Sequence, residues 1–428
     1  MLHSLYAASH IPKRMQFTRN TACPPLSMPL VINENQALTE QAIELMVRFA
    51  QRTGLTSERP QQRYLWTDAF AVCNFLGLAR ATGEQRYVEL ALALVDRVHD
   101  VLGKHRPDDS RVGWLSGLPE QVGALHPTRG GLRIGKSLPE RRADEPFDSQ
   151  VEWDRDGQYF HYLTRWMRAL DQVARATGQA RFNLWARELA EAAYRGFQQP
   201  SPRGAPPRLA WKMSIDLRRP LVPSMGQHDP LDGFITCLEL RYTASLLASE
   251  SAGPDLDDAI AGFARMVEEG DWVTADPLGI GGLLMDAERL HHLLSRASLP
   301  YQELLISLLT AALAGLQYAR MGELDQPVSR RLAFRELGLA IGLQAIARTE
   351  QDPHAATNSD SSSTQVRGLL DALAAHAPVG LIIQRFWLDP AHRRHATWTA
   401  HVDINDVMLA TTLLSAEGST LASLNETI

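Results

Sequence analysis

Two segments of this chain, offset by 95 residues, carry the same pattern and favour folds built from repeated helical hairpins. The first begins at Arg63 and reads RYLWTDAFAVCNFLGLARATGEQRYVELALAL; the second begins at Gln158 and reads QYFHYLTRWMRALDQVARATGQARFNLWARELA. In both, a helix pattern runs into ARATG, whose glycine (Gly83 or Gly178) suits the left-handed position that ends a helix. An aromatic residue four positions later begins a second amphipathic helix. The repeated unit is therefore predicted to be a helical hairpin.

Paired helix patterns continue along the chain. Further pairs are PLDGFITCLELRYTASLLASE with DLDDAIAGFARMVEE, GIGGLLMDAERLHHLLSRA with PYQELLISLLTAALAGLQYA, and SRRLAFRELGLAIGLQAIART with TQVRGLLDALAAHA. The unpaired patterns ALTEQAIELMVRFAQRTG and INDVMLATTLLSAEG, near the two ends, complete each other, so twelve helices make six hairpins. The first helix of each hairpin is apolar nearly all round, as buried helices are, and the second is amphipathic. Strand patterns are nearly absent; one exception is GLIIQRFWL, which begins at Gly380.

These patterns predict an all-α fold, an (α/α)6 toroid of six helical hairpins closed by pairing of the N- and C-terminal helices. A helical solenoid is the alternative, but a solenoid need not bring its two ends together. We expect one domain over residues 34–428, with long loops at 104–157 and 199–229 and a flexible polar insertion at 351–364. Residues 1–33 contain no Asp or Glu and are expected to lie outside the fold, as a disordered tail, a targeting segment or the product of an upstream start site.

The composition narrows the classes of partner. A formal net charge of -6 gives no electrostatic reason to expect nucleic acid, so we expect a small-molecule or oligosaccharide substrate. No stretch offers the roughly 20 uninterrupted apolar residues that a membrane span needs. Cys23, Cys73 and Cys237 are far apart and lack CxxC spacing, so neither a disulfide framework nor a zinc site is indicated. We expect a cytoplasmic protein without metal or cofactor, and the oligomeric state is not indicated.

Six hairpins with long polar loops before the inner helices resemble the six-hairpin glycosidase-like superfamily. The resemblance covers most of residues 37–417 and is one of architecture, without the diagnostic motif of a characterised family. The superfamily includes glycoside hydrolases, unsaturated glucuronyl hydrolases and N-acylglucosamine 2-epimerases. The resemblance implies carbohydrate chemistry, but a shared fold alone does not establish a function.

In such a toroid the N-termini of the inner helices face the same end, so the residues just before and after them would line one funnel. Carboxylates, histidines, arginines and large aromatics recur there. The candidate catalytic residues are Asp68, Asp156, Asp229, Asp232, Glu336 and His401, and the candidate substrate-binding residues are Trp66, Arg133, Trp153, Tyr159, His161, His228, Arg335 and Asp403. Asp is also a preferred helix cap, so each acid has a structural interpretation as well. Aromatics beside histidines are not explained by capping, whereas sugars bind by stacking on flat rings.

Two chemistries and one non-catalytic role fit these residues. A glycoside hydrolase needs a general acid and a carboxylate base, roughly 6.5–9.5 Å apart for inversion, and the best candidates are Asp68 and Asp156 from adjacent hairpins. A cofactor-free sugar epimerase would instead use histidines; GQHDPLDG loosely resembles a Gly-His-x-x-Glu turn, with His228 as the match and His401 as its partner. The third possibility is a toroid that binds a glycan or a protein without catalysis.

The segment GGLRIGKS, residues 130–137, matches the phosphate-loop pattern letter for letter. Its context argues against nucleotide binding, because no buried strand precedes it and Pro139 follows where a helix should begin. Arg133 and Lys136 on this glycine-rich segment could instead clamp a carboxylate or phosphate of a substrate. The two long loops are expected to cover the funnel as lids, because loops of that length in a compact domain are usually functional.

Overall fold

Helices dominate the computed structural model, which describes residues 29–201, 207–249, 252–268, 270–319, 324–349 and 361–415. The all-α prediction is therefore confirmed. The first helix begins at Pro29, so the last residues of the segment expected to lie outside the fold are helical. Of the predicted insertion at 351–364, residues 361–364 begin a helix and the others lie outside the described residues.

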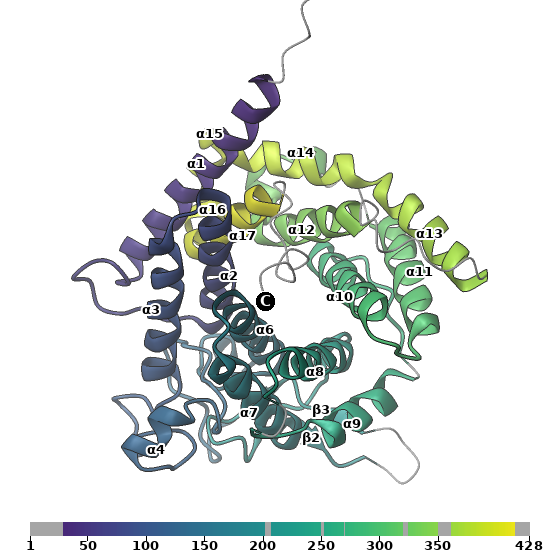
Figure 1. Ribbon diagram of the computed structural model, residues 1–428. Helices are drawn as coiled ribbons and strands as arrows, with labels where there is room; N and C mark the ends of the chain where they lie inside the picture. Colours follow the sequence, from purple (N-terminus) through teal and green to yellow (C-terminus); the bar gives the residue numbers. More distant parts are fainter. Residues whose placement is uncertain are drawn as a thin grey trace, which may run out of the picture.

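Six helices follow one another around a common axis (Figure 1). They are α2 (Leu65–Thr82), α6 (Phe160–Thr177), α8 (Asp229–Leu246), α10 (Pro277–Arg296), α12 (Ala333–Thr349) and α17 (Val402–Ser415). Each contacts the next along the chain, and α17 contacts α2. The contacts between these helices therefore close on themselves.

A second set of helices packs on the outside of the first (Figure 1). It comprises α1 (Pro29–Arg52), α3 (Gln85–Leu102), α7 (Ala180–Phe197), α9 (Asp257–Val267), α11 (Gln302–Tyr318), α13 (Ser361–Ala374) and α14 (Ala377–Leu388). Helices α3, α7, α9 and α11 each contact the helix that precedes them, and α13 contacts both α11 and α12. Helix α1 packs against α17, so segments from opposite ends of the described chain lie side by side.

The burial of the two sets follows the sequence pattern. Of the 17 residues of α12, 13 are buried, including the continuous run from Glu336 to Ile346. Helix α13 buries only Val366, Leu370 and Leu373, whose spacing of four and three residues makes one stripe. The repeat also fixes the helix ends: Gly83 and Gly178 take φ angles of 70° and 68°, in the left-handed region predicted for ARATG.

Glycines let α10 and α12 approach until their backbones nearly touch. A Cβ atom added to Gly281 would lie 2.1 Å from the carbonyl oxygen of Gly338, and one added to Gly342 would lie 2.6 Å from that of Gly281. Real Cβ atoms essentially never come this close to backbone. The glycines are therefore needed for this helix contact.

The apolar stretch GLIIQRFWL forms a helix, α14, although its pattern resembles a strand. Ile383, Gln384 and Trp387 are buried there, and the helix packs against α12. Tertiary packing thus overrides the β propensity of the adjacent isoleucines. The stretch Ser361–Leu388, which covers α13 and α14, is long and apolar enough by composition to cross a membrane, which the sequence prediction did not anticipate. A turn at residues 375–376 separates its two helices.

The remaining elements are short and lie between the long helices. They are α4 (Glu120–Leu125), α5 (Ser149–Glu152), α15 (Pro390–Arg393), α16 (Ala396–Thr399), the 3-10 turn η2 (Val328–Arg330), and the strands β1 (Gln158–Tyr159), β2 (Gln198–Gln199), β3 (Arg208–Leu209), β4 (Lys212–Met213) and β5 (Pro220–Val222). Strands β1, β4 and β5 form an antiparallel sheet in the order β1-β4-β5, and β2 pairs with β3. Because β1 runs directly into α6, the sheet brings both long loops to the N-terminus of α6.

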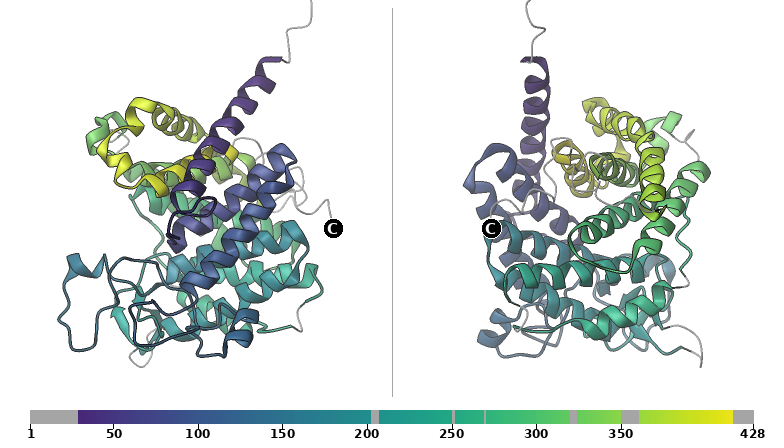
Figure 2. Two further views of the ribbon diagram at one scale, coloured as in Figure 1. Left: turned by 90° about the vertical axis from the view of Figure 1, so that its left-hand side faces the viewer. Right: turned by 45° about the vertical axis from the view of Figure 1, so that its right-hand side comes forward.

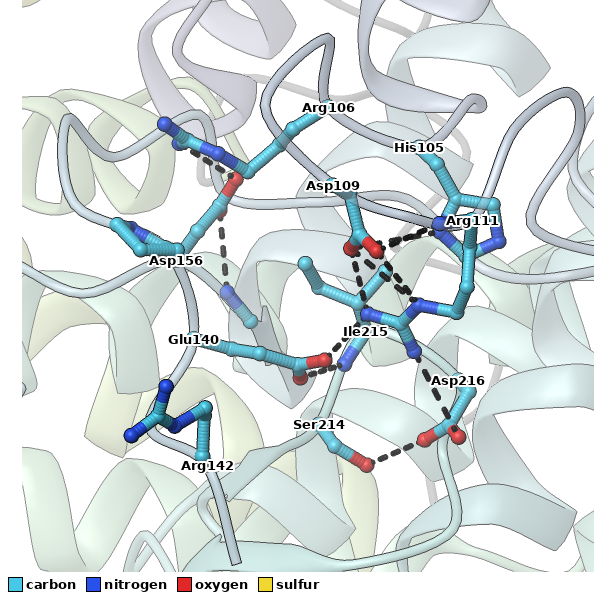
Figure 3. Close-up of polar contacts among 12 residues, drawn as sticks. His105, Arg106, Asp109, Arg111, Glu140, Arg142, Asp156, Ser214, Ile215 and Asp216 are labelled. Atoms are coloured by element: carbon cyan, nitrogen blue, oxygen red, sulfur yellow. Dashed lines mark hydrogen bonds and ion pairs between the residues drawn. The ribbon is translucent and has the colours of Figure 1, made fainter. Parts of the chain in front are cut away.

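Ion pairs hold these loops together at one end of the helical body (Figures 2 and 3). Arg111 contacts Asp109 at 2.7 Å, Glu140 at 2.6 Å and Asp216 at 3.8 Å. The hydrogen bond from Arg111 lowers the pKa of Asp109 to about 2, so this carboxylate stays charged over the physiological range. Glu140 also accepts a 2.6 Å hydrogen bond from the backbone N–H of Ile215. One arginine therefore joins three loop segments that are distant in sequence.

Candidate functional site

A cavity with a volume of about 240 Å³ is lined by side chains of α2, α6, α10, α12 and α17. Trp66 and His161, at the N-terminal ends of α2 and α6, line one end. Arg80, Arg348 and Ser415, at the C-terminal ends of α2, α12 and α17, line the other. At 1.5 Å per residue, the helix from Trp66 to Arg80 spans about 21 Å. The cavity therefore runs along most of the length of the ring.

Helix α6 contributes a polar stripe to the cavity wall. Its members His161, Arg165, Arg168 and Gln172 follow a helical spacing of four, three and four residues. Together with Arg80 and Arg348 from the neighbouring helices, four arginines line the cavity. Among the described residues of the lining, none is Asp or Glu. The cavity wall is therefore basic.

His161 presents one ring nitrogen to this cavity. The indole N–H of Trp211 donates a 3.2 Å hydrogen bond to Nδ1, so a neutral ring carries its proton on Nε2. Within the described part of the chain Nε2 makes no hydrogen bond, and it is not sealed from solvent. Burial, together with the charge of Arg165, lowers the pKa of His161 to about 4. The imidazole is therefore neutral at pH 7 and offers an N–H donor to a ligand.

Asp229 lies directly behind His161, on the first turn of α8. One carboxylate oxygen is 3.9 Å from Nδ1 of His161, and the other is buried without a hydrogen-bond partner among the described residues. Burial, followed by the negative charge of Asp232, raises the pKa of Asp229 to about 7. A carboxyl group in this environment keeps its proton to near-neutral pH, which is the property a general acid needs.

Asp232, one turn further along α8, has the opposite environment. Arg289 donates to its carboxylate at 2.9 Å and Thr164 at 2.5 Å, and Arg165 lies 3.5 Å away. Burial alone would raise the pKa of Asp232, but the charges of Arg165 and Arg289 outweigh it and lower the pKa to about 2. Two carboxyl groups in one helical turn are thus driven apart in acidity.

Arg289 stabilises this part of the core. Its side chain is fully buried and contacts Glu239 at 2.6 Å and Asp286 at 2.9 Å in addition to Asp232. Burial and the charge of Asp232 raise the pKa of Asp286 to about 7. Removing one partner of such a buried network generally costs about 3–5 kcal/mol, because the others are left uncompensated.

Aromatic rings surround the N-terminal end of α6. Tyr159, buried next to β4, lies 5.3 Å from His161 and 5.1 Å from Tyr162 between ring centroids, and Trp211 stacks on His161 at 6.0 Å. Trp153, with 53% of its surface exposed, contacts Trp211 edge-on at 5.5 Å. This arrangement places flat apolar surfaces and a neutral histidine together.

A second pocket, of about 430 Å³, gathers other predicted site residues near the N-terminus of α2. Asp68, Arg133 and Asp403 line it, but each already has a partner. Asp68 pairs with Arg63 at 3.3 Å, and burial raises its pKa to about 6 against the opposing charge of Arg63. Asp403 lies 2.8 Å from Arg52. Asp68 and His161 therefore line different pockets.

The carboxylate of Asp156, the other member of the expected acid pair, is bound by the loop that matches the phosphate-loop pattern. Arg133 contacts one carboxylate oxygen at 2.6 Å, and the backbone amides of Gly135 and Gly157 donate to the other at 3.0 and 3.1 Å. The amide of Lys136 approaches the same oxygen at 3.4 Å. The segment GGLRIGKS does bind an anion, but that anion is a carboxylate of the same chain. The clamp expected of Arg133 on a substrate is therefore already occupied.

The remaining candidates lie apart from His161. Glu336 makes a two-pronged contact with Arg331 and accepts a 2.8 Å hydrogen bond from Trp387, whereas Arg335 pairs with Asp276. His228 shares a 3.0 Å hydrogen bond with the carbonyl oxygen of Trp272. His401 is exposed and its nearest ring is that of Phe334, at 5.9 Å. The histidines proposed for an epimerase have separate surroundings.

Five important residues were not nominated from the sequence. Arg165 and Arg168 belong to the cavity-lining stripe of α6, whose helical spacing could have identified them, whereas nothing local indicates Trp211, Tyr162 or Arg289.

In the described residues, no group of three or more His, Cys, Asp or Glu side chains could hold a metal ion. No protein-family model matches the sequence. No match was found among the curated proteins.

Proposed function

We propose that the two sets of helices form an (α/α)6 toroid of six hairpins, like that of the six-hairpin glycosidase-like superfamily. Support comes from the cyclic contacts of α2, α6, α8, α10, α12 and α17 and from the packing of α1 on α17. In this arrangement the N-termini of the inner helices would share one end. The cavity would then be the interior of the toroid, open at the end of His161 and Trp66.

The chain would act on this basis as a glycoside hydrolase that binds a sugar at the aromatic end of the cavity. One observation carries the proposal: Asp229 and Asp232, one helical turn apart, have pKa values of about 7 and about 2. Environments that push two carboxyl groups apart in this way assign one as acid and the other as charged carboxylate. Asp229 would protonate the leaving oxygen, and Asp232, charged at neutral pH, would stabilise the positive charge that develops on the sugar.

The side chains between these acids and the cavity would position the substrate. His161 would donate from Nε2 to a sugar oxygen, Arg165 would bind a second polar group, and Trp66 would stack on a sugar ring. The pair Asp68 and Asp156 is a poor choice for the same chemistry. Asp68 lines the pocket near the N-terminus of α2 and not the cavity at His161.

The test is turnover of a panel of aryl glycosides and oligosaccharides, including uronic-acid-containing ones. Asp229→Asn and Asp232→Asn should each lower kcat at least 100-fold, whereas His161→Gln should mainly raise KM. Asp258→Asn changes an exposed acid on α9 and is the matched control. Circular dichroism must show that each variant is folded, which matters most for Asp232→Asn because Asp232 pairs with the buried Arg289.

The outcomes separate the candidate functions. Wild-type hydrolysis that persists in Asp229→Asn would refute the assignment of the acid. Interconversion of sugar epimers without hydrolysis would replace the hydrolase by an epimerase. Tight sugar binding with no turnover of any substrate would support a non-catalytic glycan-binding toroid.

A further inference from the structure

Arg168 lies in the middle of the cavity wall, and no hydrogen bond or ion pair joins it to the part of the chain that the structure describes. Burial, reinforced by the positive charge of Arg289, lowers its pKa. A guanidinium group carries five N–H donors and stays charged in proteins, so leaving it unpaired in a partly closed cavity is costly.

Arg348 lies at the end of the cavity opposite His161, and its hydrogen-bonding capacity is only partly satisfied. One terminal nitrogen donates to the carbonyl oxygen of Ser415 at 3.1 Å, and Nε is buried without a hydrogen-bond partner among the described residues. Burial lowers the pKa of Arg348; the charge of Glu288 opposes this effect, and that of Arg168 adds to it. Both arginines line the cavity and have N–H donors left for a negatively charged ligand.

The carboxylates of the chain do not supply that charge inside the cavity. Glu239 and Glu288 act electrostatically on Arg168, and Glu288 acts on Arg348 as well, but neither carboxylate lines the cavity. Glu239 is bonded to Arg289 at 2.6 Å, and Glu288 makes no ion pair with a described residue. Arg165, the third arginine of this group, already contacts Asp232 at 3.5 Å. On the cavity side, therefore, no carboxylate of the described lining accompanies Arg168 and Arg348.

We propose that the cavity binds a phosphate or sulfate group between Arg168 and Arg348, in the half that lies away from His161. A tetrahedral oxyanion with about two negative charges and at least three acceptor oxygens can bond two guanidinium groups at once. A single carboxylate is satisfied by one two-pronged arginine and would leave the other unpaired. Arg168 follows His161 by seven residues on one face of α6, an axial distance of about 10 Å. The inference rests on the proposed function in one respect: the substrate would be a sugar that carries this group away from the bond being cleaved.

The test is isothermal titration of the full chain with inorganic phosphate at low ionic strength, where charge interactions are least screened. Arg168→Gln and Arg348→Gln should each weaken phosphate binding at least tenfold. Arg195→Gln removes an exposed arginine of α7 that pairs with Glu191 at 2.8 Å, and it should change the affinity less than twofold. Arg168→Lys keeps the charge without the planar fork and should give an intermediate loss. This milder variant also serves if Arg168→Gln fails to fold.

Further ligands distinguish the source of the oxyanion. Sulfate should compete with phosphate, glucose 6-phosphate should bind at least as tightly as phosphate, and glucose should not displace it. No phosphate or sulfate binding by the wild type, or equal binding by Arg168→Gln, would overturn the site. Phosphate binding much tighter than that of glucose 6-phosphate would assign the site to a free anion and overturn the substrate assignment.

The two proposals fail independently. His161→Gln and Asp229→Asn should keep the wild-type phosphate affinity within twofold, because His161 lines the opposite end of the cavity from Arg348 and Asp229 lies next to His161 outside the lining. Hydrolysis of neutral glycosides without any phosphate binding would overturn this inference and leave the proposed function standing. Phosphate binding without turnover of any glycoside would do the reverse.

Discussion

Replacing Asp229 by asparagine should stabilise the protein, and the gain should depend on pH. In the folded chain the pKa of Asp229 is raised to about 7 from 3.8, so the folded state holds this proton more tightly than the unfolded state does. Stability therefore falls as pH rises from about 4, where the unfolded chain ionises, to about 7, where the folded group ionises as well. Asparagine has no proton to lose, so Asp229→Asn removes this loss.

The structure sets the size of the effect. A rise from 3.8 to about 7 corresponds to at most about 4 kcal/mol at pH 8, because one pKa unit is worth about 1.4 kcal/mol. Only 7% of Asp229 is exposed, so water screens little of this cost. The new amide needs a partner in a site where one carboxylate oxygen had none, which reduces the gain by about 1–2 kcal/mol. We expect a net stabilisation of about 2–3 kcal/mol at pH 8 and a net destabilisation of about 1–2 kcal/mol at pH 4, where only the cost of the unpartnered amide remains.

Urea denaturation of the wild type and Asp229→Asn at pH 4, 6 and 8 measures the difference directly. The variant's midpoint should exceed that of the wild type at pH 8 and should fall slightly below it at pH 4. Asp258→Asn, on the exposed side of α9, is the control and should give a small offset at every pH. A difference that does not change between pH 4 and 8, or a variant less stable than the wild type at pH 8, would refute the buried-acid interpretation. Loss of hydrolysis in the more stable variant would show that activity is maintained at the expense of stability.

Two further predictions test the scaffold. Gly281→Ala should destabilise the chain by about 2–4 kcal/mol in urea denaturation, because the new Cβ would lie 2.1 Å from the backbone of α12. The control Gly368→Ala on α13, where a Cβ meets nothing within 4 Å, should stabilise the chain by about 0.5–1 kcal/mol. Equal effects of the two substitutions would contradict the close helix contact. Asp156→Asn should lower the free energy of unfolding by about 2–3 kcal/mol, because it removes the anion bound to Arg133 and the Gly135 amide. Trypsin should then cut the glycine-rich segment 130–137 faster in limited digestion, and an unchanged rate would contradict this role of Asp156.

Much of the helical organisation could be read from local sequence. The glycines of ARATG end α2 and α6 as predicted, because a left-handed C-cap depends only on the residue and its immediate neighbours. The spacing of hydrophobic residues, which is also a local property, distinguishes α12, buried along a continuous run, from α13, which buries a single stripe. GLIIQRFWL failed as a strand signal, since packing of α14 on α12 outweighed a preference that was weak in itself.

The candidate site was predictable only as a set of residues. His161, Asp229 and Asp232 were nominated from their place at helix starts, and the structure brings these three together. Asp156 had an equally good position, yet Arg133 and a glycine-rich loop bind its carboxylate. Sequence position indicates that an acid begins a helix, but it does not indicate which cation lies opposite it.

The polar stripe of α6 shows where local reasoning ends. Its spacing is visible in the sequence, but Arg175 continues the same side of the helix three residues after Gln172 and is buried against Asp171 and Thr243 instead of lining the cavity. Contact with segments far along the chain distinguishes Arg175 from Arg168, which lines the cavity. Asp232 meets Thr164 and Arg289 across separations of 68 and 57 residues, and His161 meets Trp211 across 50. Helix period and caps are set by neighbours within a few residues, whereas burial and the charges that govern pKa are set by these distant partners.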